Sequence, residues 1–254
     1  MKIDKERLKE CYNTKDIQYF TNKYVYSNLG NLLARPFIKL NITPNQLTAL
    51  WGFFMIVFSL LFLLGNYYVN IIAGVGWVIC YSLDYTDGVV ARYKKIESRK
   101  GPFIDMVNHR VSYMTLMFCL GLSAWKYGRI EFFGLDFNPE LYIIFGFMAG
   151  LSMILIMDFG MIYNEKVPEV EVFHGRGSVN VEGQMMKNKK LFSIISNINP
   201  LVFTNMMLIL PFAAAFGILD ILIIFYGIFY PLATLGRYFI YLKMISDFQR
   251  SHQE

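Results

Sequence analysis

The residues between Asp84 and Arg92 have types and a spacing that favour metal-assisted chemistry. If this stretch is a helix, positions 84, 87, 88, 91 and 92 fall within an arc of about 140°. One face then carries two carboxylates, two small residues and a guanidinium, namely Asp84, Asp87, Gly88, Ala91 and Arg92. The preceding run, 71–83, is almost wholly apolar. Ionisable residues next to such a run are costly in a membrane and usually have a function.

A second polar pair follows on the next predicted helix. Asp105 and His109 are four residues apart, so they share one face of it. If the two helices meet there, three carboxylates and an imidazole converge, and such a cluster suits Mg²⁺ or Mn²⁺. Three carboxylates without a cation would repel one another, which argues against a purely structural polar network. Phosphoanhydride chemistry fits the site, because divalent ions neutralise phosphate oxygens while a base activates an attacking hydroxyl.

The order of these residues resembles the signature of a known family. The pattern D-x2-D-G-x2-A-R-x8-G-x3-D matches every position from Asp84 to Asp105, and it is the signature of the CDP-alcohol phosphotransferases. The chain departs from the family at the last motif position, where His109 replaces an aspartate. The resemblance implies an all-α integral membrane protein with six transmembrane helices. It also implies transfer of a substituted phosphate from a CDP-linked donor to an alcohol, with release of CMP.

The resemblance implies roles for the residues at the motif positions of this chain. The resemblance gives Asp84, Asp87 and Asp105 metal-ligand roles and turns Gly88 and Ala91 toward the nucleotide. Arg92 has two open roles, binding a diphosphate or pairing with one of the acids. Family members often carry Pro-Asn-x-x-Thr at the start of the first span, and the matching residues here are Pro44, Asn45 and Thr48. The resemblance places them near the nucleotide, although helix capping explains most of this pattern. A homodimer is implied by the resemblance alone.

His109 has three open interpretations. An imidazole near divalent cations, which favour its neutral form, is a competent base for the proton of an alcohol. It is alternatively a metal ligand through one nitrogen, which would shift metal preference toward Mn²⁺, Fe²⁺ or Zn²⁺. The third interpretation is an inactive member of the family.

The composition predicts a polytopic membrane protein. Of the 254 residues, 55% are apolar and 17% aromatic, and the chain is long enough for several spans. The formal charge of +5 does not indicate nucleic acid, because the basic residues are spread over separate loops. Three scattered cysteines, Cys11, Cys80 and Cys119, indicate neither a disulfide framework nor a zinc site. The charged opening residues predict no cleavable signal peptide.

Apolar runs and helix-start signals divide the chain into three parts. Residues 1–42 are predicted to form an N-terminal cytoplasmic or interfacial segment, 43–245 a six-span catalytic domain, and 246–254 a cytoplasmic tail. The predicted spans are about 44–65, 68–93, 102–125, 139–163, 198–217 and 219–245. An apolar set predicts an interfacial helix over about 26–40, with a soluble cap on the bundle as the alternative. This set is Leu29, Leu32, Leu33 and Phe37.

The distribution of Lys and Arg predicts the orientation. Eight precede the first span, and 92–100 and 161–197 contain five each, whereas 66–70 has none and 126–138 has two. By the positive-inside rule, both termini and the active site face the cytoplasm, and we expect a bacterial or archaeal plasma membrane.

The long loop 161–197 contains two alternating runs around a glycine-rich turn, which predict a small hairpin. It is either a plain connector or a lid whose basic residues touch phosphate or lipid. These residues are Arg176, Lys187, Lys189 and Lys190. Asp158 and Arg237 fall within predicted spans, where they pair internally or Arg237 helps to hold an acceptor phosphate.

Several functions remain compatible with the sequence. One enzyme would use CDP-diacylglycerol as donor and a polar alcohol as acceptor, making a phospholipid. Another would use a CDP-linked small head group, polyol phosphate or phosphonate as donor and a lipid or glycan as acceptor. A catalytically inactive CDP-binding member is a further alternative. A divalent-cation transporter is less well matched, because it would place polar sites near the midplane on broken helices of both halves.

Overall fold

The computed structural model describes residues 4–12, 19–96, 98, 100–128, 138–166, 197 and 199–251, and no strand occurs within these ranges. The all-α class is therefore confirmed. The elements are α1 (Lys5–Glu10), the π-helical turn η1 (Asn22–Tyr26), α2 (Ser27–Lys39), α3 (Pro44–Leu61), the 3₁₀ turn η2 (Phe62–Leu64), α4 (Tyr67–Lys94), α5 (Lys100–Tyr127), α6 (Glu140–Lys166), α9 (Phe203–Ala215) and α10 (Leu219–Ser251).

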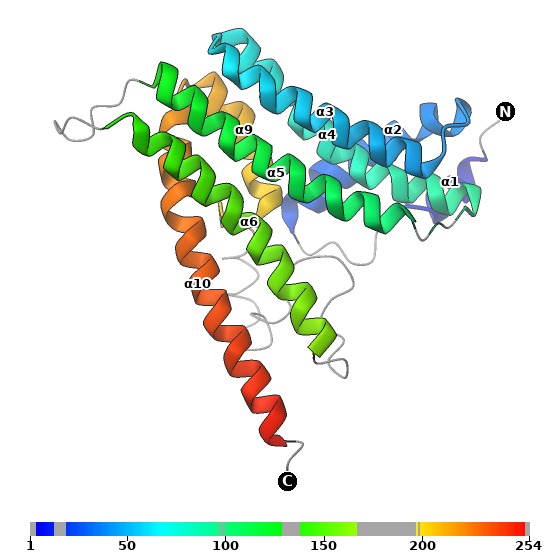
Figure 1. Ribbon diagram of the computed structural model, residues 1–254. Coiled ribbons are helices and arrows are strands. Elements are labelled where there is room, and N and C mark those ends of the chain that lie inside the picture. The colour runs from blue at the N-terminus through cyan, green and yellow to red at the C-terminus, as the bar shows by residue number, and fades with distance from the viewer. Residues whose placement is uncertain are drawn as a thin grey trace.

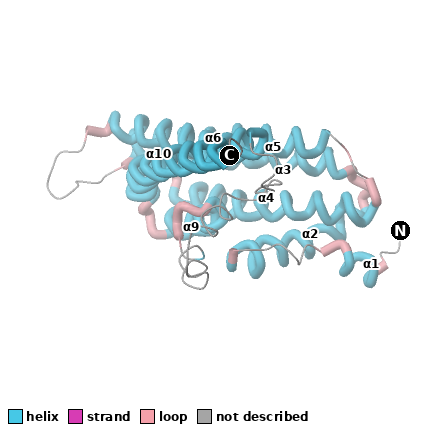
Figure 2. The backbone as a smooth tube through the Cα atoms, turned by 90° about the horizontal axis from the view of Figure 1, so that it is seen from below, coloured by secondary structure: helices cyan, strands magenta, loops and turns pink. Residues whose placement is uncertain are grey.

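Helix α4 lies at the centre of the bundle. It packs against α3 on one side and against α2 and α9 on the other (Figure 2). Helix α5 lies beside α3 and leads to α6, which pairs with α10 (Figure 1). Toward the C-terminus of the chain, helices α6 and α10 diverge from α3, α4 and α5 (Figure 1). The bundle thus has a compact part, α2 to α5 with α9, and a projecting pair.

The start of α3 follows the capping signals in the sequence. The Thr43 hydroxyl accepts a hydrogen bond from the Gln46 backbone N–H at 3.3 Å, and the Gln46 side chain accepts one from the Thr43 N–H at 2.9 Å. Pro44 occupies the first helical position, where its missing N–H costs nothing. Each end of this capping box satisfies a donor that the helix leaves unpaired.

Helix α4 ends directly after the motif arginine. Lys95 adopts a left-handed conformation, with φ 55°, and its N–H bonds back to the carbonyls of Ala91 and Arg92. A lysine accepts this conformation at a cost of about 1–2 kcal/mol. Because the chain turns here, the end of α4 and the beginning of α5 bring both halves of the motif to the same end of the bundle.

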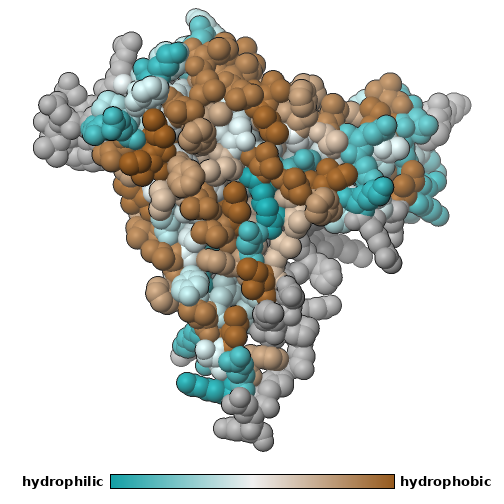
Figure 3. Space-filling model, in the orientation of Figure 1, coloured by the Kyte–Doolittle hydropathy of each residue, from teal (hydrophilic) through white to brown (hydrophobic). Residues whose placement is uncertain are grey.

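Three helices in the described ranges are long and apolar enough to cross a membrane: Pro44–Leu64, Glu140–Tyr163 and Leu219–Arg250. Apolar side chains cover much of the face in Figure 3, whereas hydrophilic ones gather at the end nearest the N-terminus and toward the C-terminus. Helix α9 is apolar but has 13 residues, or roughly 20 Å at 1.5 Å per residue. A membrane protein is therefore supported, while the count of six spans stays a prediction.

Helix α2 uses small residues for its inner face. Gly30 and Ala34 are buried against α4, and the Gly30 carbonyl accepts a hydrogen bond from the Thr86 hydroxyl at 3.0 Å. Of the predicted apolar set, Leu29 and Leu32 are 36% and 60% exposed, whereas Leu33 and Phe37 are partly buried against the core. The leucine side is thus available to an apolar environment outside the bundle, and close packing of small residues is typical of membrane helices.

The loop predicted to begin at residue 161 begins later, because α6 continues to Lys166. The predicted hairpin, with Arg176 and the three lysines, lies outside the described residues.

Candidate active site

Three motif residues converge between α4 and α5. Asp84, Asp105 and His109 each offer one ligand atom, and these atoms all lie within 4.8 Å of one another. The His109 Nε2 atom is 3.4 Å from Asp105 Oδ1 and 3.7 Å from Asp84 Oδ2. Asp105 is the most open of the three, with 40% of its side chain exposed against 14% for His109. The cluster is therefore half-buried with one carboxylate toward the outside.

Asp87 is held separately, by two donors from α3. Its Oδ2 accepts a hydrogen bond from the Thr48 hydroxyl at 2.7 Å and from the Trp51 indole N–H at 3.1 Å. Both donors are buried, with Thr48 3% exposed and Trp51 fully covered. Hydrogen bonds to a carboxylate are about twice as strong as neutral ones, so this carboxylate has a fixed orientation. Thr48 therefore contacts the motif through Asp87.

Aromatic rings surround the His109 imidazole. Its centroid lies 5.0 Å from the Trp51 ring, 5.4 Å from the Tyr113 ring and 6.3 Å from the Tyr81 ring. Within the described part of the chain, the buried His109 Nδ1 atom has no hydrogen-bond partner. The Nε2 atom, in contrast, faces the two carboxylates. The ring is thus packed in one orientation with Nε2 directed at the acids.

The remaining nucleotide-site candidates lie at the same end of the bundle. The Asn45 side-chain amide donates to the Ser98 hydroxyl at 3.1 Å, and its Oδ1 would be 3.1 Å from a Cβ at Gly101. Asn45 therefore joins α3 to the connection between the motif halves. Ala91 is half-buried on α4. The structure does not bring Asn45 into the acidic cluster.

Arg92 contacts the N-terminal segment. Its Nε donates to the Cys11 carbonyl at 2.8 Å, and its Nη1 would lie 3.3 Å from a Cβ at Gly88. The guanidinium therefore lies beside Gly88 on the face predicted to meet the nucleotide. The neighbouring Tyr93 ring is covered by Arg7, whose guanidinium carbon is 4.9 Å from the ring centroid. The segment containing α1 thus packs on the C-terminal residues of α4.

Two polar links flank His109 on α5. The Asn108 side-chain amide donates to the Thr48 carbonyl at 2.7 Å. Arg110 forms an ion pair with Asp158 of α6, with Nε 2.8 Å from Asp158 Oδ1. Asp158, for which the sequence left the partner open, is therefore paired with Arg110.

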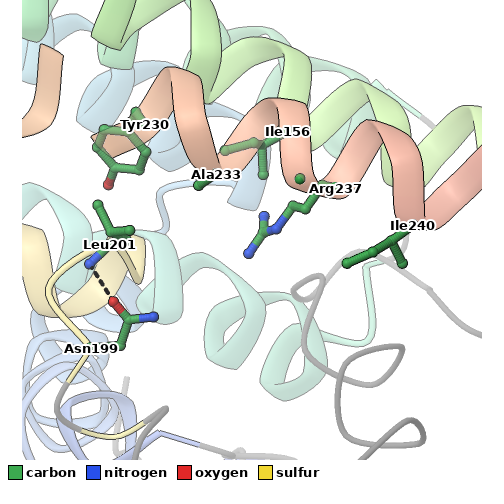
Figure 4. Close-up of a pocket in the computed structure, with 8 residues that line it drawn as sticks. Ile156, Asn199, Leu201, Tyr230, Ala233, Arg237 and Ile240 are labelled. Atoms are coloured by element: carbon green, nitrogen blue, oxygen red, sulfur yellow. Dashed lines mark hydrogen bonds between the residues drawn. The ribbon is translucent and has the colours of Figure 1, made fainter. Parts of the chain in front are cut away.

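Arg237 lines a cavity of about 180 Å³ between α10 and the segment before α9. Figure 4 shows its guanidinium directed into the open middle, with Leu201 and Asn199 on the opposite side. A row of packed aromatic rings extends from the acidic cluster to the wall of this cavity. The ring centroids of Tyr113 and Phe203 are 5.4 Å apart, and those of Phe203 and Tyr230 are 6.2 Å apart. The cavity wall is completed by Ile156, Tyr230, Ala233, Gly236 and Ile240.

Sequence reasoning missed Trp51 and Asn108. Trp51 follows Thr48 by three residues and therefore shares its helix face, which was a usable signal. Asn108 offered only a polar side chain in an apolar helix, beside His109.

The donor set fits a divalent ion. Mg²⁺ binds oxygen ligands at about 2.1 Å, so ligand atoms on opposite sides of one ion are about 4.2 Å apart. Small side-chain rotations bring the 4.8 Å group of Asp84, Asp105 and His109 to this spacing. Asp87 keeps Oδ1 for an ion, because both of its α3 donors bind Oδ2. The one nitrogen ligand makes Mn²⁺ as suitable as Mg²⁺.

Comparison with known proteins gives a family for this chain. A search of curated proteins gave no match for the chain. The sequence profile of the CDP-alcohol phosphatidyltransferases matches residues 41–226, which include α3, α4, α5 and the motif on them. The match covers most of the chain and all of the acidic cluster. The chain therefore belongs to the CDP-alcohol phosphatidyltransferase family.

Proposed function

We propose that this protein transfers a substituted phosphate from a CDP-linked donor to an alcohol at the cytoplasmic membrane face, with Mg²⁺ or Mn²⁺, and releases CMP. Family membership supports transfer from a CDP-alcohol to an acceptor. The observation that carries the proposal is the convergence of Asp84, Asp105 and His109 at the motif end of α4 and α5. Asp87, oriented by Thr48 and Trp51, supplies a further carboxylate beside them.

A bound divalent ion would neutralise the phosphate oxygens and polarise the phosphorus. Asp84, Asp105 and His109 would hold it, with Asp87 as an additional ligand. In the reaction, the bond between the donor phosphorus and the CMP oxygen breaks, and a bond from the same phosphorus to the acceptor oxygen forms. Arg92, beside Gly88, would bind the charge that remains on CMP.

The position of His109 favours a ligand role over a base. Its Nε2 faces Asp84 and Asp105, while its Nδ1 is buried near aromatic rings. With Nε2 facing two carboxylates and Nδ1 buried, the imidazole is better placed to bind an ion than to take a proton from an alcohol. We assign acceptance of the alcohol proton to the Asp105 carboxylate oxygen that would not hold the ion, because Asp105 has the most exposed side chain of the cluster. The proton then passes to solvent.

The Arg237 cavity supports a small anionic acceptor. Its volume of about 180 Å³ is below the roughly 300–1,000 Å³ of sites for drug-sized ligands, and it presents a guanidinium. A phosphorylated polyol fits this size and charge better than a lipid tail. This favours the lipid-linked donor, CDP-diacylglycerol, with a polar alcohol phosphate as the acceptor. Glycan and lipid acceptors are the weaker alternative.

The membrane setting completes the proposal. The exposed leucines of α2 would lie in the cytoplasmic interface, with both termini on that side. The homodimer implied by the family resemblance remains part of the proposal.

The test is CMP release by the purified protein in lipid. Donors are CDP-diacylglycerol and CDP-linked small alcohols, each offered with polyol phosphates, lipids and glycans, and Asp87→Ala is the blank. We expect release from CDP-diacylglycerol that needs Mg²⁺ or Mn²⁺ and stops with a chelator. CDP binding without release under every condition would instead identify an inactive member, and ion flux without release would identify a transporter.

A matched pair of variants tests the cavity. Arg237→Met should raise the KM for the acceptor at least tenfold with little change for the donor, because a charged hydrogen bond contributes about 1.5–3 kcal/mol. Arg250→Met, on the exposed end of α10, removes the same charge outside the cavity. Equal acceptor KM values in the two variants would contradict the assignment.

A further inference from the structure

Three consecutive residues of α5 face three different partners. Asn108 reaches α3, His109 faces the acids of the cluster, and Arg110 reaches α6. Successive residues of an α-helix are about 100° apart around its axis. The contacts of Asn108 and Arg110, one on each side of His109, therefore limit the rotation of α5 about its axis. The rotation of α5 determines where the His109 imidazole lies.

The Asn108 link depends on a close approach between α5 and α3. The amide donates to the Thr48 carbonyl at 2.7 Å, and the Thr48 hydroxyl in turn holds Asp87. The amide lies directly on the backbone of Gly52, because a Cβ at Gly52 would overlap the Asn108 amide group. Gly52 thus leaves the space that Asn108 occupies. One residue of α3, Thr48, connects α5 to a motif carboxylate of α4.

The Arg110 link lies on the other side of α5. Its Nε and Nη2 both donate to Asp158 Oδ1, and its Nη1 donates to the Met106 carbonyl of the preceding turn at 3.1 Å. The Arg110 side chain is 18% exposed. A charged pair within an apolar helix bundle is costly, and such pairs often add little stability compared with well-packed apolar side chains. We therefore consider how the Arg110–Asp158 ion pair fixes the orientation of α5, not how much it stabilises the fold.

We propose that Asn108 and Arg110 are positioning residues, which fix the rotation of α5 so that His109 Nε2 meets Asp84 and Asp105. A rotation of about 10° displaces an atom roughly 7 Å from the helix axis by roughly 1 Å. Metal ligands tolerate deviations of about 0.2 Å, so this displacement weakens ligation. The inference rests on the proposed function, because it assumes that His109 belongs to the metal-binding cluster.

The primary readout is Mn²⁺ affinity, measured by electron paramagnetic resonance without substrate, followed by kcat and KM for CMP release. Asn108→Ala deletes the link, and Gly52→Ala displaces the Asn108 amide while the backbone stays in place. Ser123→Ala is the matched control, because Ser123 donates a buried hydrogen bond from the far end of α5 to the Phe62 carbonyl at 2.8 Å. We expect about tenfold weaker Mn²⁺ binding and lower kcat in the first two variants and wild-type values in the control.

The ion pair is tested by replacing both charges. Arg110→Met alone leaves Asp158 without this partner and is expected to lower the melting temperature. The double variant Arg110→Met/Asp158→Leu is expected to regain the melting temperature but not the Mn²⁺ affinity or kcat. Recovery of all three quantities in the double variant would overturn the proposal, because the pair would then only support folding.

Three other outcomes would count against the positioning role or against the proposed function. Wild-type Mn²⁺ affinity and kcat in both Asn108→Ala and Gly52→Ala overturn the positioning role. An equal loss in Ser123→Ala also overturns it, because the effect would follow from any loosening of α5. Failure of the unmodified protein to bind Mn²⁺ and release CMP refutes the proposed function itself, which is a distinct result.

Discussion

The two donors that hold Asp87 provide the sharpest test of the site. Trp51→Phe keeps a ring against His109 but removes the N–H that is 3.1 Å from Asp87 Oδ2. Thr48→Val keeps the side-chain shape but removes the shorter bond, at 2.7 Å. Each bond is made to a carboxylate, and such bonds contribute about 1.5–3 kcal/mol. If that energy orients Asp87 for the reaction, each variant loses roughly 10- to 150-fold in kcat/KM.

The two losses should not add. Both donors bind the same oxygen, so each retains part of the orientation when the other is removed, and neighbouring sites of this kind commonly couple by about 0.5–3 kcal/mol. We therefore expect Thr48→Val to have the larger single effect and the double variant to approach the Asp87→Ala blank. The assay is metal-dependent CMP release from protein in lipid, with the melting temperature measured on the same samples.

A second tryptophan provides the control. The Trp77 indole N–H donates to the Ser59 hydroxyl at 3.1 Å, also between α4 and α3, and both residues are fully buried. Trp77→Phe removes the same kind of donor about 10 Å along α4 from Asp84 and keeps a ring against Tyr113, so we expect a comparable fall in melting temperature with unchanged kcat/KM. Wild-type activity in the Thr48→Val/Trp51→Phe double variant would refute the reasoning, because Asp87 would then need no orientation.

Three further predictions follow from packing and donor type. His109→Asp should raise the ratio of Mg²⁺-supported to Mn²⁺-supported CMP release, because the cluster then has only oxygen ligands; an unchanged ratio contradicts the ligand role. Gly30→Ala should lower the melting temperature, since the added Cβ would be 2.8 Å from Tyr85 Cβ and overpacking costs about 1–3 kcal/mol. Gly121→Ala should do the same by pushing α5 from the α6 backbone, where its Cβ would meet a carbonyl at 2.6 Å. Gly160→Ala is the control for both, with its nearest contact at an ordinary 3.6 Å, and an equal fall there would contradict these two predictions.

The sequence predicted the helical class and the family because both depend on local patterns. Apolar runs define membrane helices, and the motif spacing defines which side chains share a face. The i, i+4 relation of Asp105 and His109 needs no tertiary information. The start of α3 at Pro44 is likewise set by its own capping residues.

Contacts between helices could not be predicted from the sequence, because they depend on how each helix is rotated against its neighbours. One partner of Arg92 is the carbonyl of Cys11, a backbone atom 81 positions away. For helix α2, the sequence predicted an interfacial helix but not which of its residues meet α4. Gly30 does so, because small residues let membrane helices pack closely, and a Cβ there would be 2.8 Å from Tyr85 Cβ.

The acidic cluster and the Arg237 cavity are built by different stretches of the chain. Residues from Asn45 to Tyr113, on α3 to α5, supply the cluster and its nearest supports, whereas the described residues that line the cavity lie between Ile156 and Ile240. Within the later stretch, Asp158 is the exception, because it pairs with Arg110 beside the cluster, and the lining residues can be substituted without changing that pair. Under our assignment, evolution could therefore change which alcohol this protein accepts by altering α6, α9 and α10, while the reaction itself stays the same.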